Sequence, residues 1–422
     1  MSDRVLLVGG GAREHATAWK LAQSPRIGEL FIAPGNTGTA LLGENLPYKT
    51  TDIDGIVGAA KAHRIDFYLA TSDDPQPLGL VDRLQAEGIP CYGPSARAAR
   101  IEASKAWAKA FMARHGIPTA EGQSFDDYRE ACAYVESLPP GKLWVKASGL
   151  AAGKGAVGCE THDETLAALK EMLVEHRFGA SSDTIVIERD MPGRETSAHA
   201  FCDGKTAVLW PFSTDYKRAL DNGEGPNTGG MGSYSPSVGI GTDTALQIRQ
   251  SVVDPLIAGM AAEGHPYVGT LYPGLMLTAE GPKIVEYNAR QGDPETQVYM
   301  PRLQSDLYEI VKEAARGNLA STAIRWSERP AVGICVVSRG YPEAFDTGFP
   351  VQGLDAMDPG VLVFHAGTRA SEGAVITAGG RVCTVVATGA TMAEARAIAY
   401  DNARRISFQN AYYRSDIALE AV

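Results

Sequence analysis

Two lysines within one stretch of small residues are the first candidates for chemistry. Leu143–Gly158 begins as a short apolar strand that delivers Lys146, and Lys154 follows between two glycines. A backbone with few bulky side chains can approach a ligand closely, and two ammonium groups supply point charges for one anion. We expect a flexible lid over a nucleoside triphosphate, although these residues alone fit a simple turn between two strands equally well. The stretch is not a P-loop, because only three residues separate Gly149 from Gly153.

A second candidate site pairs an acid with an amide on one predicted strand. Glu286 and Asn288 are two residues apart, so their side chains point to the same face. Carboxylate and amide oxygens are hard ligands that suit Mg²⁺ or Mn²⁺. For this pair alone, a solvated strand face is the favoured interpretation. Arg290 and Asp293, which follow closely, bring the two interpretations level.

Two glycine-rich turns each follow a predicted strand near the N-terminus. The first is Gly9-Gly10-Gly11, before a predicted helix at 13–23, and the second is Pro34–Thr39. The carboxyl ends of strands in open α/β sheets bind ligands, and glycine amides at a helix N-terminus favour a phosphate. The dinucleotide fingerprint fails, because Glu14 occupies the position of its third glycine. Simple chain reversal remains the alternative for each turn.

A long segment in the middle of the chain is predicted to be irregular. It contains Asp215–Arg218 and then Gly225–Gly232, which reads GPNTGGMG. We expect this segment to be too glycine-rich for a core element. Long loops of this kind usually carry function or are disordered.

Strands and helices alternate in a pattern that would position these candidates. The alternation predicts α/β structure up to about residue 100, a second and smaller α/β unit, and a hinge at Glu188–Gly193. From about Trp326 the texture changes to short strands, turns and a last helix at Met392–Ile406, typical of an α+β domain. This last domain shows no chemical motif of its own. The predicted domains are residues 1–103, 104–190, 191–325 and 326–422.

Composition sets limits on the class of protein. The chain has 422 residues, 44% hydrophobic and 21% charged, which is typical of a globular protein of several domains. A net charge of −11 disfavours a nucleic-acid surface. The six cysteines are scattered, as expected for reduced thiols in the cytoplasm. With no apolar run of membrane-spanning length and no signal peptide, we expect a cytoplasmic monomer that handles small molecules.

A series of motifs occurs in a fixed order along the chain: a glycine turn followed by REH, then APGN, KASGLAAGKG, GPNTGGMG, VEYNAR and GDPETQ. Together they resemble the phosphoribosylamine–glycine ligase family (glycinamide ribonucleotide synthetases), ATP-grasp enzymes of purine biosynthesis. The resemblance runs from about residue 4 to residue 415. It implies a multidomain α/β and α+β fold, with a Rossmann-like N-terminal (pre-ATP-grasp) domain, a lid, a central ATP-grasp domain and a small C-terminal α+β domain.

The resemblance also implies a role for individual residues. At the nucleotide it implies Lys105, Lys146 and Lys154 for the phosphates, Glu188 and the Met191 backbone for adenine, and Glu195 for ribose. It implies Glu286 and Asn288 as ligands of Mg²⁺ or Mn²⁺. Its catalytic residues are Arg290, Lys154, Asp215 and Lys217. Its substrate residues are Gly10, Gly11, Arg13, Glu14, Gly35, Asn36, Asp73, Asp74, Arg218, Asn227, Gly229, Gly230 and Asp293.

The implied activity is an ADP-forming ligation of glycine to 5-phosphoribosylamine through a glycyl phosphate. The sequence departs from the family pattern at Thr71–Leu78, where Gly-Pro-Glu is usual, and at Tyr216, where His is usual. We therefore hypothesise that the acceptor site is remodelled. A paralogous ligase for another amine or amino acid, in primary or secondary metabolism, is the second interpretation. The third, a nucleotide-binding protein without catalysis, is disfavoured because the lysines, Glu286, Asn288 and Arg290 are all present.

Overall fold

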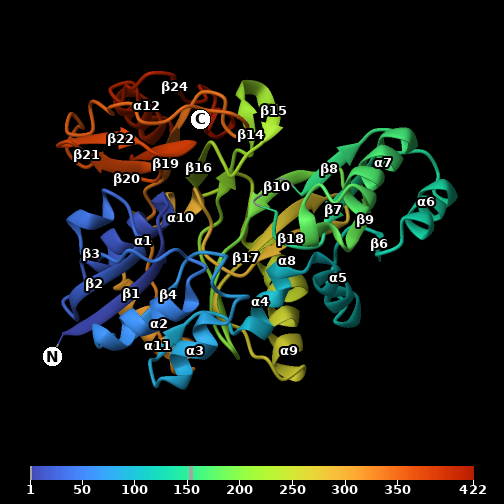
Figure 1. The fold of residues 1–422 in the computed structure, drawn as a ribbon, viewed down its shortest axis with the longest axis horizontal. Helices are drawn as coiled ribbons and strands as arrows, with labels where there is room; N and C mark the ends of the chain where they lie inside the picture. The colour runs from blue at the N-terminus through green and yellow to red at the C-terminus, as the bar shows by residue number, and fades with distance from the viewer. Residues whose placement is uncertain (1, 152–154) are drawn as a thin grey trace.

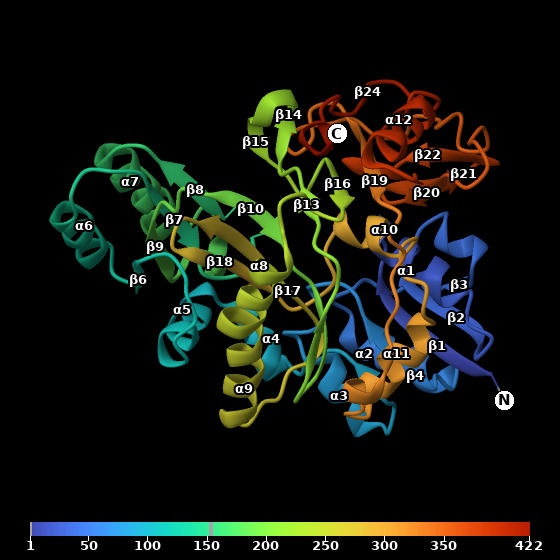
Figure 2. The ribbon, with the colours of Figure 1, turned by 180° about the vertical axis from the view of Figure 1, so that it is seen from behind.

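The structure is a computed structural model and describes residues 2–151 and 155–422. Figure 1 shows the N-terminal unit in blue and the C-terminal unit in red on one side of the molecule, with a green unit projecting from the other. Figure 2 shows the same arrangement from behind, with the helices α8 and α9 in front. Within the described residues, no helix is long and apolar enough to cross a membrane.

A five-stranded parallel sheet forms the N-terminal unit, with strand order β3-β2-β1-β4-β5. The strands predicted from apolar runs are confirmed, and β1 and β4 are buried almost throughout, as a sheet covered on both faces requires. Both glycine turns and Thr71–Asp73 follow carboxyl ends of neighbouring strands, so they meet at one edge. The elements are β1 (Asp3–Gly9), α1 (Ala12–Leu21), β2 (Ile27–Pro34), β3 (Glu44–Asn45), α2 (Ile53–Ala62), β4 (Phe67–Ala70), α3 (Leu80–Ala86) and β5 (Cys91–Tyr92).

The projecting unit contains a four-stranded antiparallel sheet, the lid sheet, in the order β6-β9-β7-β8. Helices α6 and α7 pack together, and an apolar core lies between them and the sheet. The sequence pattern predicts one helix over 163–178, but the helical conformation ends at Val174, in a wider turn that follows α7. The elements are α4 (Ala96–Ala103), α5 (Lys105–Arg114), β6 (Gly122–Phe125), α6 (Tyr128–Ser137), β7 (Leu143–Ala147), β8 (Ala156–Cys159), α7 (His162–Leu169) and β9 (Ile185–Arg189).

A second antiparallel sheet, in the order β10-β17-β11-β12 with β18 paired to β17, lies between the other units. The sequence pattern predicts strands at 269–278 and 283–287 that pair across Glu280-Gly281, and the structure confirms this hairpin as β17–β18. The hairpin sets Asn288 opposite Tyr272 and Glu286 opposite Gly274. The elements are β10 (Arg194–Ser197), β11 (Ala200–Asp203), β12 (Ala207–Leu209), α8 (Thr242–Ile248), α9 (Asp254–Ala262), β17 (Val268–Thr278), β18 (Gly281–Asn288), α10 (Glu295–Tyr299) and α11 (Leu307–Ala315).

The C-terminal sheet corrects one prediction about the glycine-rich segment. The sheet order is β13-β16-β19-β23-β20, with β24 paired to β19. The segment predicted to be irregular therefore contributes to β13 and β16 of this sheet and to the separate β14–β15 hairpin. Strand β16 is fully buried, and a Cβ at Gly232 would lie 2.7 Å from the Gly333 carbonyl oxygen. The glycine therefore permits close strand packing. The elements are β13 (Thr214–Asp215), β14 (Arg218–Leu220), β15 (Glu224–Asn227), β16 (Gly232–Ser235), β19 (Ala331–Ser338), β20 (Leu362–His365), β21 (Thr368–Ser371), β22 (Ala374–Thr377), β23 (Arg381–Thr388), α12 (Met392–Ala403) and β24 (Ala411–Tyr412).

Candidate active site

A buried carboxylate on the lid sheet binds two lysines. Glu188 Oε2 lies 2.6 Å from Lys146 Nζ, and Glu188 Oε1 lies 2.7 Å from Lys109 Nζ. Burial raises the pKa of Glu188, but the ammonium groups of Lys146 and Lys109 outweigh burial and hold that pKa below its usual value. The Glu188 side chain is thus committed to these lysines. Its main chain lies in a central strand, opposite Gly122 of β6 and Trp144 of β7, so the adenine contact that the resemblance implies stays a prediction.

Lys105 begins helix α5 beside the start of the glycine-rich stretch. The Lys105 amide donates to the Ser148 carbonyl at 2.8 Å, and its Nζ lies 3.5 Å from the Gly149 carbonyl oxygen. Burial lowers the pKa of Lys105, the Glu286 carboxylate raises it, and the Lys146 ammonium lowers it further. Lys105 and Lys146 therefore both interact electrostatically with Glu286, which lies on the other sheet. Lys154 lies outside the described residues, so its role stays a prediction.

The acid and amide of the predicted metal site lie on β18. Asn288 is buried, accepts at Oδ1 from Arg290 Nη2 at 3.0 Å, and donates from its amide nitrogen to the Tyr272 carbonyl at 3.3 Å. Burial raises the pKa of Glu286, while Lys217 and Lys105 lower it to below its usual value. Among the described residues, no group of three or more His, Cys, Asp or Glu could hold a metal ion. A cation here would need further ligands from a substrate.

Lys217 lies between two glutamates from different strands. Its Nζ is 3.9 Å from Glu286 Oε1 and 4.0 Å from Glu195 Oε2. Burial lowers the pKa of Lys217, but Asp215 and the two glutamates raise it above its usual value, so the ammonium is retained. Glu195 is half-exposed on β10, and Met191 lies in the connection from β9 to β10. Both are therefore accessible to a nucleotide lying between the sheets.

A second acid lies close to Asp215. Ser197 Oγ donates to Asp215 Oδ1 at 3.1 Å and lies 3.4 Å from Glu295 Oε1, and the Tyr272 hydroxyl donates to the same Glu295 oxygen at 2.6 Å. Burial, and then the nearby Asp215 carboxylate, raise the pKa of Glu295 to about 7. Sequence reasoning assigned no role to Glu295, although it lies in the GDPETQ motif. Asp215 and Glu295 form an acidic wall beside Lys217.

Arg290 connects the metal-site strand to the N-terminal half of the chain. Its Nε lies 3.2 Å from Glu102 Oε1, and its Nη1 donates to the Gln291 carbonyl at 3.1 Å. Burial lowers the pKa of Arg290, and Glu102 and Asp73 raise it above its usual value. Sequence reasoning missed Glu102. It lies on α4, nearly two hundred residues before Arg290, where a single acid on a helix gives no signal.

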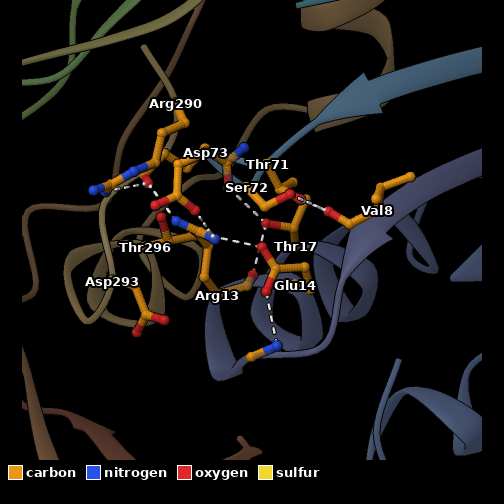
Figure 3. Close-up of polar contacts among 12 residues, drawn as sticks. Val8, Arg13, Glu14, Thr17, Thr71, Ser72, Asp73, Arg290, Asp293 and Thr296 are labelled. Carbon is orange, nitrogen blue, oxygen red and sulfur yellow. Dashed lines mark hydrogen bonds and ion pairs between the residues drawn. The ribbon is translucent and has the colours of Figure 1, made fainter. Parts of the chain in front are cut away.

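The first glycine turn is occupied by side chains of its own helix. Glu14 Oε2 accepts from the Gly11 amide at 2.8 Å, and Glu14 Oε1 lies 2.6 Å from Arg13 Nε (Figure 3). Arg13 Nη1 donates to the Gln291 carbonyl at 3.2 Å. The Gly11 amide, which we expected to be available to a phosphate, is therefore a helix-capping donor to Glu14. Arg13 instead carries a buried positive charge to this edge of the sheet.

The second glycine turn is held by Asn36. Its amide nitrogen donates to the Gly10 carbonyl at 3.0 Å and to the His365 carbonyl at 2.8 Å, and its Oδ1 accepts from the Gly38 amide at 2.8 Å. Gly35 has a φ of +68°, and a Cβ there would lie 2.2 Å from Asn45 Oδ1, so only glycine fits. Asn36 thus ties both predicted phosphate turns to the C-terminal unit.

The two adjacent acids after β4 point to different neighbours. Asp73 Oδ1 lies 3.9 Å from Arg13 Nη2, and Figure 3 shows Asp73 between Arg13 and Arg290. Burial raises the pKa of Asp73, and Arg290 and Arg13 lower it below its usual value. Asp74 is exposed, and its Oδ2 accepts from the Thr50 hydroxyl at 3.1 Å. The structure brings Asp73 to the site and leaves Asp74 outside it.

Arg218 and Asn227 lie opposite each other in the β14–β15 hairpin. Arg218 is exposed, and its Nη1 donates to the Gly225 carbonyl at 2.8 Å, within the hairpin itself. Figure 1 shows this hairpin projecting beside the C-terminal unit. These two predicted substrate residues are therefore not brought to the cluster that contains Arg290.

The C-terminal unit contributes a residue that sequence reasoning missed. Arg381 Nη2 lies 3.0 Å from Asp293 Oδ2, and Arg381 Nη1 donates to the Gly229 carbonyl at 2.7 Å. The Gly229 amide donates to the Tyr341 hydroxyl at 3.0 Å. Burial raises the pKa of Asp293, but Arg381 and Arg13 lower it below its usual value. The Arg381 guanidinium thus brings together three of the predicted substrate residues, Gly229, Gly230 and Asp293.

Two antiparallel sheets that face one another, with lysines on one and a Glu/Asn pair on the other, define an ATP-grasp protein. Lys146 Nζ reaches from the lid sheet to the Val285 carbonyl of β18 at 3.2 Å. The chain belongs to the phosphoribosylglycinamide synthetase family. The model of that family's N domain matches residues 3–102, its ATP-grasp (A) domain matches residues 103–296, and its C domain matches residues 331–420.

Known relatives span the whole chain. A phosphoribosylamine–glycine ligase from Caulobacter vibrioides is 48% identical over 422 residues, which cover 99% of this chain and 98% of that protein. The crystal structure of a phosphoribosylamine–glycine ligase from Thermotoga maritima has a TM-score of 0.87 and 34% identity, covering 98% of this chain and all of that one. The biotin carboxylase domain of a 2-oxoglutarate carboxylase from Hydrogenobacter thermophilus shares the fold, with a TM-score of 0.76 and 14% identity over 98% of this chain and 92% of that one.

Proposed function

We propose that this protein joins glycine to 5-phosphoribosylamine at the expense of ATP, giving glycinamide ribonucleotide, ADP and phosphate in purine biosynthesis. The observation that supports the proposal most strongly is the full-length similarity to phosphoribosylamine–glycine ligases, 48% for the Caulobacter vibrioides protein. The site fits this chemistry, because Lys105, Lys146 and Lys217 lie near the acid–amide pair of β18.

The chemistry requires activation, because a carboxylate is a poor electrophile. Transfer of the γ-phosphoryl group of ATP to a glycine carboxylate oxygen forms glycyl phosphate and releases ADP. The amine nitrogen then attacks the carbonyl carbon, phosphate leaves with the C–O bonding pair, and the amine loses a proton. Negative charge develops in both steps, and the cations Lys105, Lys146 and Arg290 are placed to stabilise it.

Glu286 and Asn288 would hold Mg²⁺ or Mn²⁺. Their oxygens are the donors that a hard cation prefers, and Mg²⁺ in nucleotide sites commonly takes one or two protein oxygens and completes its shell with phosphates and water. The Asn288 oxygen, which accepts one hydrogen bond from Arg290, retains a second lone pair for a cation. When bound, the metal neutralises charge on the phosphate oxygens. The adenine would lie at Met191 and the ribose at Glu195.

The acceptor would bind at the edge where the glycine turns meet. Gly10 and Gly35 supply close backbone approach, Asn36 fixes both turns, and Arg13 supplies positive charge. Asp73 stands where the family usually has a glutamate, and its carboxylate is turned toward Arg13. A carboxylate that is shorter by one methylene group changes which hydroxyl or amine it can reach, so the sugar would be held differently here.

Activity with fresh substrate tests this function. ADP release would be measured with glycine, ATP and freshly generated phosphoribosylamine, and glycinamide ribonucleotide would be identified by mass. Product formation, together with rescue of a purine-requiring strain that lacks this enzyme, is the expected result. Absence of product while hydroxylamine still traps an acyl phosphate would contradict the proposal and indicate a different amine. If the sugar contact is shifted, Asp73→Glu should speed turnover.

We also propose that the protein works in the cytoplasm as a monomer on small molecules, without nucleic-acid or membrane partners. The net charge of −11 supports this, because phosphate backbones and anionic lipids would be repelled. Light scattering of the purified protein would test the monomer. A stable dimer would contradict it.

A further inference from the structure

Arg381, at the first position of β23, contacts two loops that lie far apart in the sequence. Its Nη1 donates to the Gly229 carbonyl at 2.7 Å and to the Asp293 carbonyl at 2.9 Å, and its Nη2 lies 3.0 Å from Asp293 Oδ2. A guanidinium can serve several acceptors at once because its donors form a rigid fork. The side chain is 20% exposed, so these contacts are largely shielded from water.

The first of these loops is joined to the segment between β13 and β14 that contains Lys217. The Thr228 amide donates to the Lys217 carbonyl at 2.7 Å, and the Met231 amide donates to the Tyr216 carbonyl at 2.8 Å. Gly229 is closely packed, since a Cβ there would lie 3.2 Å from the Arg381 guanidinium carbon. Movement of Arg381 would therefore displace the backbone beside Lys217.

The second loop reaches the first glycine turn. A Cβ at Gly11 would lie 3.3 Å from Asp293 Oδ2, so the carboxylate that Arg381 holds is directly beside that turn. Asp293 Oδ1 also accepts from the Gln297 side chain at 2.7 Å. Arg381 thus connects the Lys217 side of the site, where the carboxylate would be activated, with the turn where the acceptor would bind.

We propose that Arg381 is a positioning residue. It holds the amine site close enough to the acyl phosphate site for the amine to attack before water does. This inference rests on the proposed function. An acyl phosphate that finds no amine within reach is attacked by water, which regenerates glycine and releases phosphate. By fixing the Gly229 carbonyl and Asp293 together, Arg381 holds the two halves of the site at the distance that ligation needs.

The test compares Arg381→Gln with Arg405→Gln. Arg405 is a matched control, because it lies in the same unit and pairs at 2.8 Å with Asp358 in an exposed contact outside this junction. The ratio of ADP to glycinamide ribonucleotide would be measured, together with the KM values for each substrate and the unfolding temperature. For Arg381→Gln, kcat/KM for phosphoribosylamine should fall by about a hundredfold, the loss that a displacement of about 1 Å can cause. The amount of ADP formed per molecule of glycinamide ribonucleotide should rise. The KM for ATP should change by less than about twofold, because the substitution leaves the residues that would bind ATP unchanged.

Equal loss of ADP and product, with an unchanged ratio, would overturn the proposal and leave Arg381 a structural contact. If Arg381→Gln fails to fold, Arg381→Lys serves instead, since a point charge cannot reach both loops and should also raise the ratio. Amide exchange of Gly229–Gly232 separates this inference from the proposed function. Faster exchange in the Arg381 variant than in wild type and Arg405→Gln supports positioning even if wild type makes no product, and equal exchange in all three contradicts it.

Discussion

The two ends of the site are built differently. The ATP end consists of Lys105, Lys109, Lys146 and Glu188 from the projecting unit, and of Glu286 and Asn288 on β18 of the central sheet. The acceptor end consists of Arg13, Asn36, Asp73, Asp293 and Arg381, drawn from three separate units. At the ATP end, charges meet each other, as in the 2.6 Å contact of Lys146 with Glu188. At the acceptor end, side chains mostly reach main-chain carbonyls of another unit.

This difference indicates what each end requires of the fold. The lysine cluster of the ATP end needs only the neighbouring strands β7 and β9 and helix α5, so this cluster can form within one unit. Strand β18 of the central sheet then completes the ATP end. The acceptor end is complete only when the N-terminal, central and C-terminal units are docked. The contacts of Arg13 with Gln291, of Asn36 with His365 and of Arg381 with Asp293 each cross between two of these units. Damage at the ATP end should therefore remove phosphoryl transfer, whereas damage at the acceptor end should leave activation intact and impair ligation.

The largest expected effect tests the ATP end. Glu286→Gln removes a metal ligand and a charge, so ADP formation should fall by about a thousandfold, the upper range for loss of one electrostatic contact in a transition state. The requirement for Mg²⁺ should rise. Glu280→Gln, in the same hairpin but exposed, is the control. If Glu286→Gln shows wild-type turnover and metal dependence, Glu286 is not a metal ligand and only forms part of a solvated strand face.

The next prediction concerns the carboxylate of Glu188, which neutralises two lysines of the ATP end, Lys109 and Lys146. Glu188→Gln leaves two ammonium groups without their buried carboxylate, so unfolding of the projecting unit should become easier by about 3–5 kcal/mol. Glu160→Gln, which removes only an exposed pair with Lys142, should change stability by about 0.5 kcal/mol or less. Denaturant unfolding measures both variants. Equal effects would show that the contacts of Glu188 are dispensable.

The third prediction concerns the pH dependence of stability caused by Glu295, which lies beside Asp215 and Lys217. Because burial and Asp215 raise the pKa of Glu295 to about 7, the folded protein keeps a proton that the unfolded chain releases near its usual value of 4.5. This contribution to stability is complete below about pH 4.5 and is lost as pH rises through about 7. Relative to Glu295→Gln, wild type should lose on the order of 3 kcal/mol over that range. Parallel stability curves for the two proteins would contradict this prediction.

The smallest effect concerns the two acids after β4. Asp73→Asn should lower kcat/KM for the amine by about tenfold, since it removes the charge beside Arg13, while ADP formation without amine stays near wild type. Asp74→Asn should lie within about twofold of wild type, because a single exposed hydrogen bond to Thr50 contributes little. Steady-state kinetics with varied amine would decide. Equal losses in both variants would show that the acceptor lies nearer Thr50 than we propose.

Local pattern in the sequence was enough for much of the fold and for the placement of several charged residues on its elements. Apolar runs bounded by glycine predict β1, β2 and β4, and the Ser104 N-cap predicts helix α5, because strand and cap geometry depend on residues close together. The spacing of Glu286 and Asn288 likewise follows from the period of one strand. The sequence predicts Lys146 as a phosphate ligand because an apolar strand leads there into a stretch of small residues, and this role stays a prediction.

The tertiary structure alone decided which of these residues meet and what covers the acceptor end. Sequence could not show that Gly232–Ser235 is a core strand, because its partner β19 lies about a hundred residues away. It gave no sign of Glu102 beside Arg290 or of Arg381 beside Asp293, since a charged residue at the end of an element looks the same whether solvent or another unit receives it. Burial and docking fix such partners, and neither is encoded in local spacing.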